Sequence, residues 1–271
     1  MRDAIHFVHG NGFPSSCYRQ LLEPLQAQFD CYSLERVGHT DVFPVTDNWH
    51  HLVQEVIFSI EQQTTQPVIA LGHSLGGVLS LLASMERPEL FKAVVMLDSP
   101  LLGWLKSMTL KAFKYFGMVD KVTPAHRTRG RRKHWKSKEQ VWSYLKNRPL
   151  FASFTDACLQ DYIDFGLEQD NTGYTLRFDR HIEYQIYRTI PHILPRYEQK
   201  ETRPVALIYG NKSRVVSAHD LRYLKKKHSV VCYPITGGHM FPFEHPQVTA
   251  ARIIDVIHEL LEQPVKQEGR V

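Results

Sequence analysis

A chain of 271 residues with 43% hydrophobic residues can bury a proper core, as one large domain or as a core with an insertion. Its 33 basic and 28 acidic side chains leave a formal net charge of +5, which is too small to argue for a nucleic-acid partner. The four cysteines are widely spaced, and the 15 histidines form no usual metal-binding motif. We therefore expect no disulfide framework, no metal ion and no cofactor.

The N-terminal residues show no targeting signal. The apolar strand expected at Ile5 is not preceded by a charged segment followed by a long apolar segment, as a signal peptide would require. No apolar run reaches the length of a membrane span. Together with the scattered cysteines, this predicts a cytoplasmic protein without an integral membrane segment. The sequence leaves the oligomeric state open.

Apolar runs of strand length alternate with helix-like segments in the first hundred residues. In chain order the pattern predicts strand 4–8, helix 17–28, strand 29–34, helix 49–62, strand 68–71, a helix ending near residue 87, and strand 93–97. The alternation returns late in the chain, with strand 204–210, helix 218–227, strand 230–234 and helix 246–262. Such alternation is typical of an α/β fold with a mostly parallel sheet covered by helices on both faces.

The middle of the chain differs from the rest in composition and in its pattern of apolar residues. Residues 101–200 are rich in aromatic and basic side chains, and they suggest helices over 102–116, 137–147, 155–166 and 180–187. Because this block falls between two strands of the sheet, we expect it to be an insertion over the carboxyl ends of the strands, where sites in such sheets lie. The predicted organisation is a core of residues 1–100 and 201–271 with a helical cap of residues 101–200.

One stretch of the core carries a signal for catalysis. Between the strand at 68–71 and the helix after it, the chain reads Gly72-His73-Ser74-Leu75-Gly76-Gly77. The pattern G-x-S-x-G between a strand and a helix is typical of a nucleophile elbow, a turn so sharp that its neighbours must be glycine. The helix would direct its positive end toward Ser74, where an oxyanion would form.

With two further motifs, the chain resembles the α/β-hydrolase superfamily over nearly its whole length. These motifs are His9-Gly10-Asn11-Gly12 after the first strand and Gly237-Gly238-His239 before the last helix. The similarity is to compact, esterase-like members with a helical cap. The order and spacing of the three motifs are specific for the fold and far less specific for the substrate.

The resemblance implies roles for individual residues. Ser74 would be the nucleophile and His239 the general base, since a serine hydroxyl needs a neighbouring imidazole to take its proton. The oxyanion hole would use the backbone N–H groups of Leu75 and Asn11. Phe13 would line the substrate pocket.

The acid of the triad departs from the pattern of the superfamily. Most members carry it as G-x-x-D after the strand at 204–210, but here that stretch ends in Ser213. Asp220 lies seven residues further on and looks like part of a helix. Some members take the acid from the strand after the nucleophile helix, which here ends at Asp98. Asp98 is thus the best candidate, and its alternative role is that of a turn-forming residue before Ser-Pro.

The predicted cap contains a basic run. Seven of the twelve residues from 127 to 138 are Lys or Arg. The simplest interpretation is a solvated surface, and the alternatives are recognition of an anionic substrate such as an acyl-coenzyme A or contact with an acidic membrane surface. A single tryptophan, Trp135, is too little to indicate nucleic-acid binding.

These features favour a serine hydrolase that acts on a small-molecule carboxylic ester or thioester. A cofactor-free haloperoxidase-like enzyme or a C–C bond hydrolase on the same triad is the alternative activity. A catalytically inactive binding protein is a third possibility, suggested by the serine at position 213 and opposed by the intact Ser74 and His239. Epoxide and haloalkane hydrolysis are disfavoured, because relatives with those activities carry Asp in place of Ser74.

Overall fold

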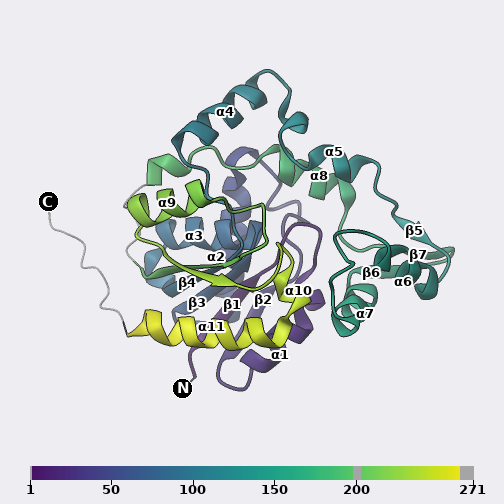
Figure 1. Ribbon diagram of the computed structural model, residues 1–271, viewed down its shortest axis with the longest axis horizontal. Coiled ribbons are helices and arrows are strands. Elements are labelled where there is room, and N and C mark those ends of the chain that lie inside the picture. Colours follow the sequence, from purple (N-terminus) through teal and green to yellow (C-terminus); the bar gives the residue numbers. More distant parts are fainter. Residues whose placement is uncertain (1, 198–202, 263–271) are drawn as a thin grey trace, which may run out of the picture.

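The computed structural model describes residues 2–197 and 203–262, with all side chains in these ranges except those of Arg127 and Arg129. Its central strands are β1 (Ala4–Val8), β2 (Asp30–Leu34), β3 (Val68–His73), β4 (Phe91–Leu97), β8 (Val205–Gly210) and β9 (Val231–Ile235). They form a six-stranded sheet in the order β2-β1-β3-β4-β8-β9, and every pairing is parallel. The predicted fold class is confirmed (Figure 1).

The strand order changes direction at β1. This strand pairs with β2 on one side and with β3 on the other, so the connection after β2 crosses back over it. The loops that leave β1 and β3 therefore run to opposite faces of the sheet. The crevice between such loops, outside the carboxyl ends of the strands, is where open α/β sheets place their ligands.

Helices cover both faces of the sheet. They are α1 (Arg19–Leu25), α2 (His50–Gln63), α3 (Leu75–Glu86), α9 (Ala218–Lys227), α10 (Phe241–Glu244) and α11 (Pro246–Leu261). Ile5 and Phe7 of β1 belong to one apolar cluster with α1 and α11, whereas Ala4 and Val8 belong to a second cluster with α2 and α3. Alternate side chains of a strand point to opposite faces, which explains why β1 is buried at every position.

An inserted segment connects β4 to β8. Its helices and strands are α4 (Trp104–Tyr115), α5 (Ala125–Arg129), β5 (His134–Trp135), α6 (Lys138–Lys146), α7 (Asp156–Phe165), β6 (Leu167–Asp170), β7 (Gly173–Leu176) and α8 (Arg180–Arg188). Short 3₁₀ helices lie between these elements, at Ser15–Tyr18, Asp47–Trp49, Pro88–Leu90, Val119–Lys121 and Leu194–Tyr197. In Figure 1 the inserted segment runs from α4 at the top of the molecule to α6 and α7 at its right. Among the described helices, none is long and apolar enough to cross a bilayer.

The structure follows the predicted order of core elements, with shifts at their ends. The helix expected over 17–28 begins as a 3₁₀ turn and ends as α1 at Leu25. The helix expected over 49–62 begins at His50, because Asn48 and Trp49 both adopt a left-handed backbone with φ of 60°.

The inserted segment is less helical than expected. Helices α4, α6, α7 and α8 correspond to the four expected helices, but α5 and the three-stranded antiparallel sheet β5-β7-β6 were not expected. These strands are two to four residues long and partly exposed, so they leave little alternation to detect. The expected boundary between residues 200 and 201 falls outside the described residues, and the boundary after residue 100 stays a prediction.

Candidate active site

The turn between β3 and α3 has the sharp conformation expected of an elbow. Ser74 at its apex has φ of 53° and ψ of −112°, which L residues rarely adopt. Its N–H donates to the C=O of Leu97 at 2.8 Å. A Cβ on Gly72 would lie 2.3 Å from the carbonyl carbon of Gly76, and a Cβ on Gly76 would lie 1.9 Å from the backbone oxygen of Val8. The elbow can therefore form only with glycine at both positions.

His239 and Asp98 meet although 141 residues separate them in the chain. Nδ1 of His239 donates to Oδ2 of Asp98 at 2.7 Å. Because a carboxylate only accepts hydrogen bonds, this contact assigns the ring proton to Nδ1 and leaves Nε2 free to accept a proton. The Asp98 side chain is fully buried, whereas that of His239 is 28% exposed. A buried acid behind an accessible imidazole is the arrangement that a general base requires.

The hydroxyl of Ser74 lies outside this hydrogen-bonded pair. Within residues 2–197 and 203–262, no hydrogen bond links Ser74 Oγ to His239. Nucleophile–base contacts are commonly long in free enzymes and shorten when substrate binds. Ser74 is partly exposed at the base of a cleft, so its hydroxyl can be reached from solvent.

Asp98 is held in place by β8 and the loop that follows it. It has a left-handed backbone, with φ of 43°, and its N–H donates to the C=O of Ile208 at 2.8 Å. Its Oδ1 accepts from the N–H of Gly210 at 3.0 Å. Its Oδ2 accepts from the hydroxyl of Ser213 at 2.5 Å, beside the contact with His239. Ser213, at the position where the superfamily usually carries the acid, therefore donates a hydrogen bond to the candidate acid Asp98.

Asp220 does not take part in this arrangement. Its carboxylate pairs with Lys106 at 2.7 Å. It also accepts from the N–H of Ser217 at 2.9 Å, which forms a capping box at the start of α9. Of the three positions weighed for the acid, only Asp98 contacts His239 among the described residues.

Two backbone N–H groups near Ser74 are available to an oxyanion. Asn11 and Leu75 line the same cleft as Ser74. Leu75 is the first residue of α3, so its N–H has no acceptor inside the helix. In the described part of the chain, neither N–H donates to another protein atom. The side chain of Asn11 anchors its loop, because Nδ2 donates to the C=O of Glu183 at 3.0 Å.

His73 links the loops on either side of the elbow. The N–H of Gly10 donates to the hydroxyl of Tyr18 at 3.0 Å, and that hydroxyl contacts Nδ1 of His73 at 2.7 Å. Nε2 of His73 lies 3.0 Å from the C=O of His239, which can only accept. Burial, reinforced by the His239 imidazole, lowers the pKa of His73 well below its usual value. The ring is therefore neutral, with its proton on Nε2 and with Nδ1 accepting from Tyr18.

A cleft of about 460 Å³, counting the solvent at its mouth, opens beside Ser74. Asn11, Ser74 and Tyr187 are its polar or partly polar lining residues. The others are apolar or aromatic: Trp49, Leu75, Val78, Pro100, Leu102, Ile186, Ile190, Pro191 and Leu194. None of these lining residues is charged, so the cleft suits an uncharged, largely apolar group.

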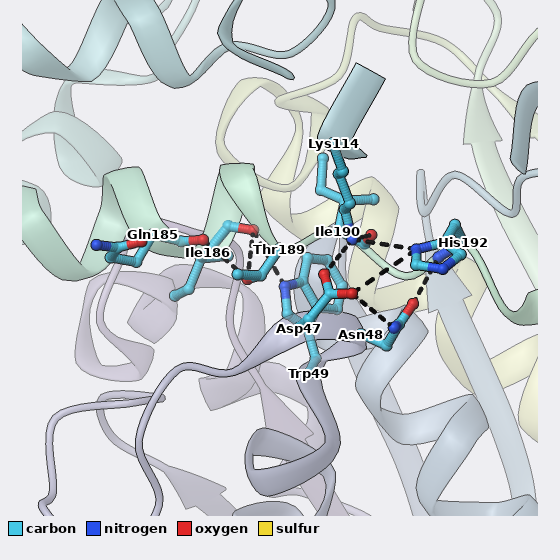
Figure 2. Close-up of polar contacts among 9 residues, drawn as sticks. All are labelled: Asp47, Asn48, Trp49, Lys114, Gln185, Ile186, Thr189, Ile190 and His192. Carbon is cyan, nitrogen blue, oxygen red and sulfur yellow. Dashed lines mark hydrogen bonds and ion pairs between the residues drawn. The ribbon is translucent and has the colours of Figure 1, made fainter. Parts of the chain in front are cut away.

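One wall of the cleft joins segments that are far apart in the sequence (Figure 2). The indole N–H of Trp49 donates to the C=O of Ile186 at 3.0 Å. Lys114 of α4 contacts the carboxylate of Asp47 and donates to the C=O of Ile190 at 2.6 Å. Burial lowers the pKa of Lys114, and the contact with Asp47 opposes that shift. These contacts hold α4, the start of α2 and the end of α8 together around the cleft.

Phe13 lies elsewhere than expected. Its side chain is 5% exposed and packs against Tyr162 and Phe243, with ring centroids 5.1 and 5.4 Å away. It is not among the residues that line the cleft. Gly12, with φ of 84°, turns the chain between Asn11 and Phe13, so the ring enters the seam between the core and the inserted segment. The described contacts give Phe13 a packing role.

Two cations of the basic run at residues 127–138 form ion pairs within the inserted segment. Arg131 makes two hydrogen bonds of 3.0 Å with the carboxylate of Glu183, which is almost fully buried. Lys138 pairs with Asp164 at 2.5 Å. Apart from Arg127 and Arg129, whose side chains lie outside the described part of the structure, none of the run's residues lines the cleft. Arg131 therefore has a structural role that a solvated surface did not lead us to expect, and no described residue of the run lies where it would recognise an anionic substrate in the cleft.

Comparison with known proteins identifies the family and the fold of the chain. The model of the alpha/beta hydrolase family matches residues 7–252. An uncharacterized hydrolase of Bacillus subtilis, YugF, is 28% identical over 94% of this chain and 90% of its own. Among solved structures, E-2-(acetamidomethylene)succinate hydrolase is similar with a TM-score of 0.76, at 21% identity over 95% of this chain and 92% of that one. The thioesterase domain from the curacin biosynthetic pathway has a TM-score of 0.73, at 15% identity over 93% and 91%.

The chain belongs to the alpha/beta hydrolase family. The family match covers both the elbow and the His239 loop, so the resemblance inferred from the three glycine-rich motifs is confirmed. At identities of 21% and 15%, the two solved structures establish a shared fold.

Proposed function

We propose that this protein is a serine hydrolase that cleaves a carboxylic ester or thioester through an acyl-enzyme on Ser74. The observation that carries the proposal is the 2.7 Å hydrogen bond between His239 and the buried Asp98, at an elbow that opens into an apolar cleft. Membership of the hydrolase family supports it, as does the pair of free N–H groups at Asn11 and Leu75.

The proposed reaction has two halves. Nε2 of His239 takes the proton of Ser74 as Oγ attacks the carbonyl carbon, and the N–H groups of Asn11 and Leu75 stabilise the oxyanion. His239 then gives that proton to the departing alcohol or thiol, which leaves an acyl group on Ser74. In the second half His239 activates a water molecule, which releases the acid and restores the serine. Asp98 holds the tautomer and stabilises the imidazolium in both halves.

The alternative activities use the same residues. C–C bond hydrolysis or a cofactor-free haloperoxidase-like reaction would also require Ser74, His239 and Asp98. The absence of charged residues from the cleft lining favours an ester or thioester with an apolar acyl group. The contact between Asp98 and His239 weighs against a catalytically inactive binding protein, because Asp98 can supply the carboxylate that is missing at position 213.

We also propose that residues 101–200 cap the cleft and that the protein acts in the cytoplasm.

A substrate panel tests the proposal. p-Nitrophenyl esters of increasing acyl length, offered beside acyl-coenzyme A thioesters, should show turnover that rises from acetate to longer acyl groups, because each added methylene is buried in the cleft. Ser74→Ala should abolish turnover of every substrate. Ser84→Ala is the matched control, since it removes a buried hydroxyl from α3 that donates to the C=O of Leu81 within the same helix. Absence of ester and thioester turnover in the wild type would overturn the proposal.

A further inference from the structure

Exposed apolar side chains gather on one part of the inserted segment. Twelve large hydrophobic side chains are exposed among the described residues, and seven of them lie between residues 104 and 122. We call these seven the α4 patch: Trp104, Leu105, Met108, Tyr115, Phe116, Met118 and Val122. Tyr115 is 85% exposed and Leu105 is 69% exposed. A concentration of this kind on a folded protein marks an interaction surface.

Four of the seven patch residues lie on one side of α4, and the other three follow its C-terminal end. Trp104, Leu105, Met108 and Tyr115 recur at intervals of three, four and seven residues along α4, which places them on adjoining turns of one face. The opposite side of the helix buries Ser107 and Leu110. In Figure 1, α4 lies at the outer edge of the molecule, away from the central sheet. The patch therefore faces outward while the helix is packed from beneath.

Two exposed lysines accompany the patch. Residues 101–122 contain four lysines and one acidic residue, Asp120, which is paired with Arg188. Lys106 and Lys114 pair with carboxylates outside this stretch, so the other two lysines carry its free positive charge. Lys111 and Lys121 are exposed. Aromatic and aliphatic side chains beside exposed lysines are typical of helices that lie in the headgroup region of a membrane, where anionic lipids attract the cations. Binding to a protein partner would not by itself require tryptophan and phenylalanine to lie beside lysine.

We propose that the α4 patch docks on a lipid surface that carries anionic headgroups, with α4 lying in the plane of the interface. The helix has 12 residues and is thus about 18 Å long, too short to span a bilayer and suited to lying on one. Docking brings the cleft to the lipid. Leu102 lines the cleft two residues before α4 begins, and Lys114 on α4 bonds to the C=O of Ile190 in the cleft wall.

Docking and catalysis are separable. The delivery of an apolar ester from the lipid into the cleft rests on the proposed function, whereas binding to the lipid surface does not. The Ser74→Ala variant should therefore bind vesicles as the wild type does while it hydrolyses nothing. Failure of the serine-hydrolase mechanism would leave vesicle binding intact, and failure of docking would leave turnover of soluble esters intact.

Vesicle flotation tests the docking. The 271-residue chain is mixed with vesicles of phosphatidylcholine and phosphatidylglycerol in equal amounts, or with phosphatidylcholine alone. We expect binding to the mixed vesicles, weaker binding to the neutral ones, and a blue shift of tryptophan fluorescence on binding that Trp104→Phe removes. The triple variant Leu105→Gln, Met108→Gln, Phe116→Gln should lose at least about 100-fold in partitioning, because three large side chains can no longer be buried.

A matched control changes apolar side chains outside the patch. Val42 and Val248 are 73% and 62% exposed, and the double variant Val42→Gln, Val248→Gln should bind vesicles like the wild type. Both sets of variants should keep the wild-type circular dichroism and the wild-type turnover of a soluble short-chain ester.

The outcomes decide the docking proposal. Wild-type protein that floats with neither kind of vesicle, or a triple variant that floats as well as the wild type, would overturn it. Equal binding to neutral and mixed vesicles would overturn the requirement for anionic lipid. A concentration-dependent dimer that the triple variant loses, without vesicle binding by the wild type, would assign the patch to a second copy of the chain instead.

Discussion

At the end of β4, a single residue with a left-handed backbone determines where the acid of the candidate triad lies. Asp98 has φ of 43°, a conformation that is unfavourable for a non-glycine residue. The bond from its N–H to the C=O of Ile208 holds that conformation, and the Ser213 hydroxyl and the Gly210 N–H hold its carboxylate. These three contacts fix the orientation in which the Asp98 carboxylate contacts His239.

We predict that Asp98→Asn lowers kcat by about 10⁴-fold, because an amide favours the wrong tautomer of His239 and provides no charge for the imidazolium. Asp220→Asn, which removes a carboxylate paired with Lys106, should change kcat little. Steady-state kinetics on one p-nitrophenyl ester measure both. Adding Ser213→Asp to Asp98→Asn should restore part of the activity, since position 213 already reaches the same site. Normal turnover by Asp98→Asn would remove Asp98 from the triad.

His73 is expected to position the groups around it. His73→Leu should lower kcat by about tenfold or more while KM changes little, because the backbone of His239 and the Gly10 loop lose their common support. His73→Gln, which keeps one acceptor and one donor, should recover part of kcat. A buried, neutral His73 does not titrate near neutral pH, so the pH profile of kcat/KM should keep its shape in both variants. Equal kcat in Leu and Gln variants would contradict the role of the hydrogen bonds.

At the scale of elements, the β3–elbow–α3 unit could be predicted because its determinants are local. Backbone contacts within this unit and with β1 require glycine at positions 72 and 76. The G-x-S-x-G motif contains both glycines, so the sequence alone shows this requirement. Phe13 shows the opposite case. Its partners Tyr162 and Phe243 come from α7 and α10, so no pattern near Phe13 could show that its ring packs away from the cleft.

The inserted segment escaped prediction for a related reason. The strands β5, β6 and β7 pair with one another, and each buries a single residue, so none of them shows a buried alternating face in its sequence. In the basic run, charge alone could not separate Arg131, which is paired with Glu183, from the exposed Lys133. Only the folded arrangement distinguishes a cation that holds the structure from one that faces solvent.

That distinction can be measured. Arg131→Gln should destabilise the protein by about 3 kcal/mol or more, because it leaves Glu183 largely buried without its partner. The C=O of Glu183 anchors Asn11, so turnover should fall for neutral and anionic substrates alike. Lys133→Gln should change stability by less than about 0.5 kcal/mol, as is usual for exposed positions. Urea denaturation gives the stabilities, and a loss confined to anionic substrates in Lys133→Gln would revive the steering interpretation.

For the whole molecule, buried titratable groups determine how stability varies with pH. Burial lowers the pKa of His6 to about 3 and that of His9 to about 4. Below about pH 6.5 the unfolded chain binds protons at these imidazoles and the folded protein does not, so the free energy of unfolding falls as the pH falls. Glu55 has the opposite effect: burial raises its pKa to about 7, so its contribution is lost as the pH rises from about 4.5 toward 7. Burial also lowers the pKa of His73 and raises that of Glu183. Three buried imidazoles outweigh the two carboxyls.

We therefore predict that the free energy of unfolding decreases between about pH 6.5 and about pH 4.5. Each buried imidazole contributes a slope of about 1.4 kcal/mol per pH unit in this window. His6→Gln should reduce the slope by about that amount, because it removes one of the buried imidazoles. Urea denaturation of both proteins at several pH values measures the slopes. Identical slopes would contradict a neutral, buried His6 in the folded protein.

The whole molecule also shows why the cleft could not be predicted from the sequence. Its lining comes from the loop after β1, the start of α2, the elbow, the residues after β4 and the end of α8. Trp49 and Ile186 meet across 137 residues of chain, and no local pattern connects them. The order of strands predicted where a site would lie, whereas the apolar character of its walls depends on contacts that exist only in the fold.

The most direct test of the central claim is labelling with a fluorophosphonate probe, followed by intact mass measurement and peptide mapping. An activated serine forms a covalent adduct with the probe, and an ordinary serine does not. We predict one adduct per wild-type chain, located at Ser74, no adduct in Ser74→Ala, and strongly reduced labelling in His239→Ala. An unlabelled wild-type protein, or a Ser74→Ala variant labelled as fully as the wild type, would contradict the assignment of Ser74 as the nucleophile.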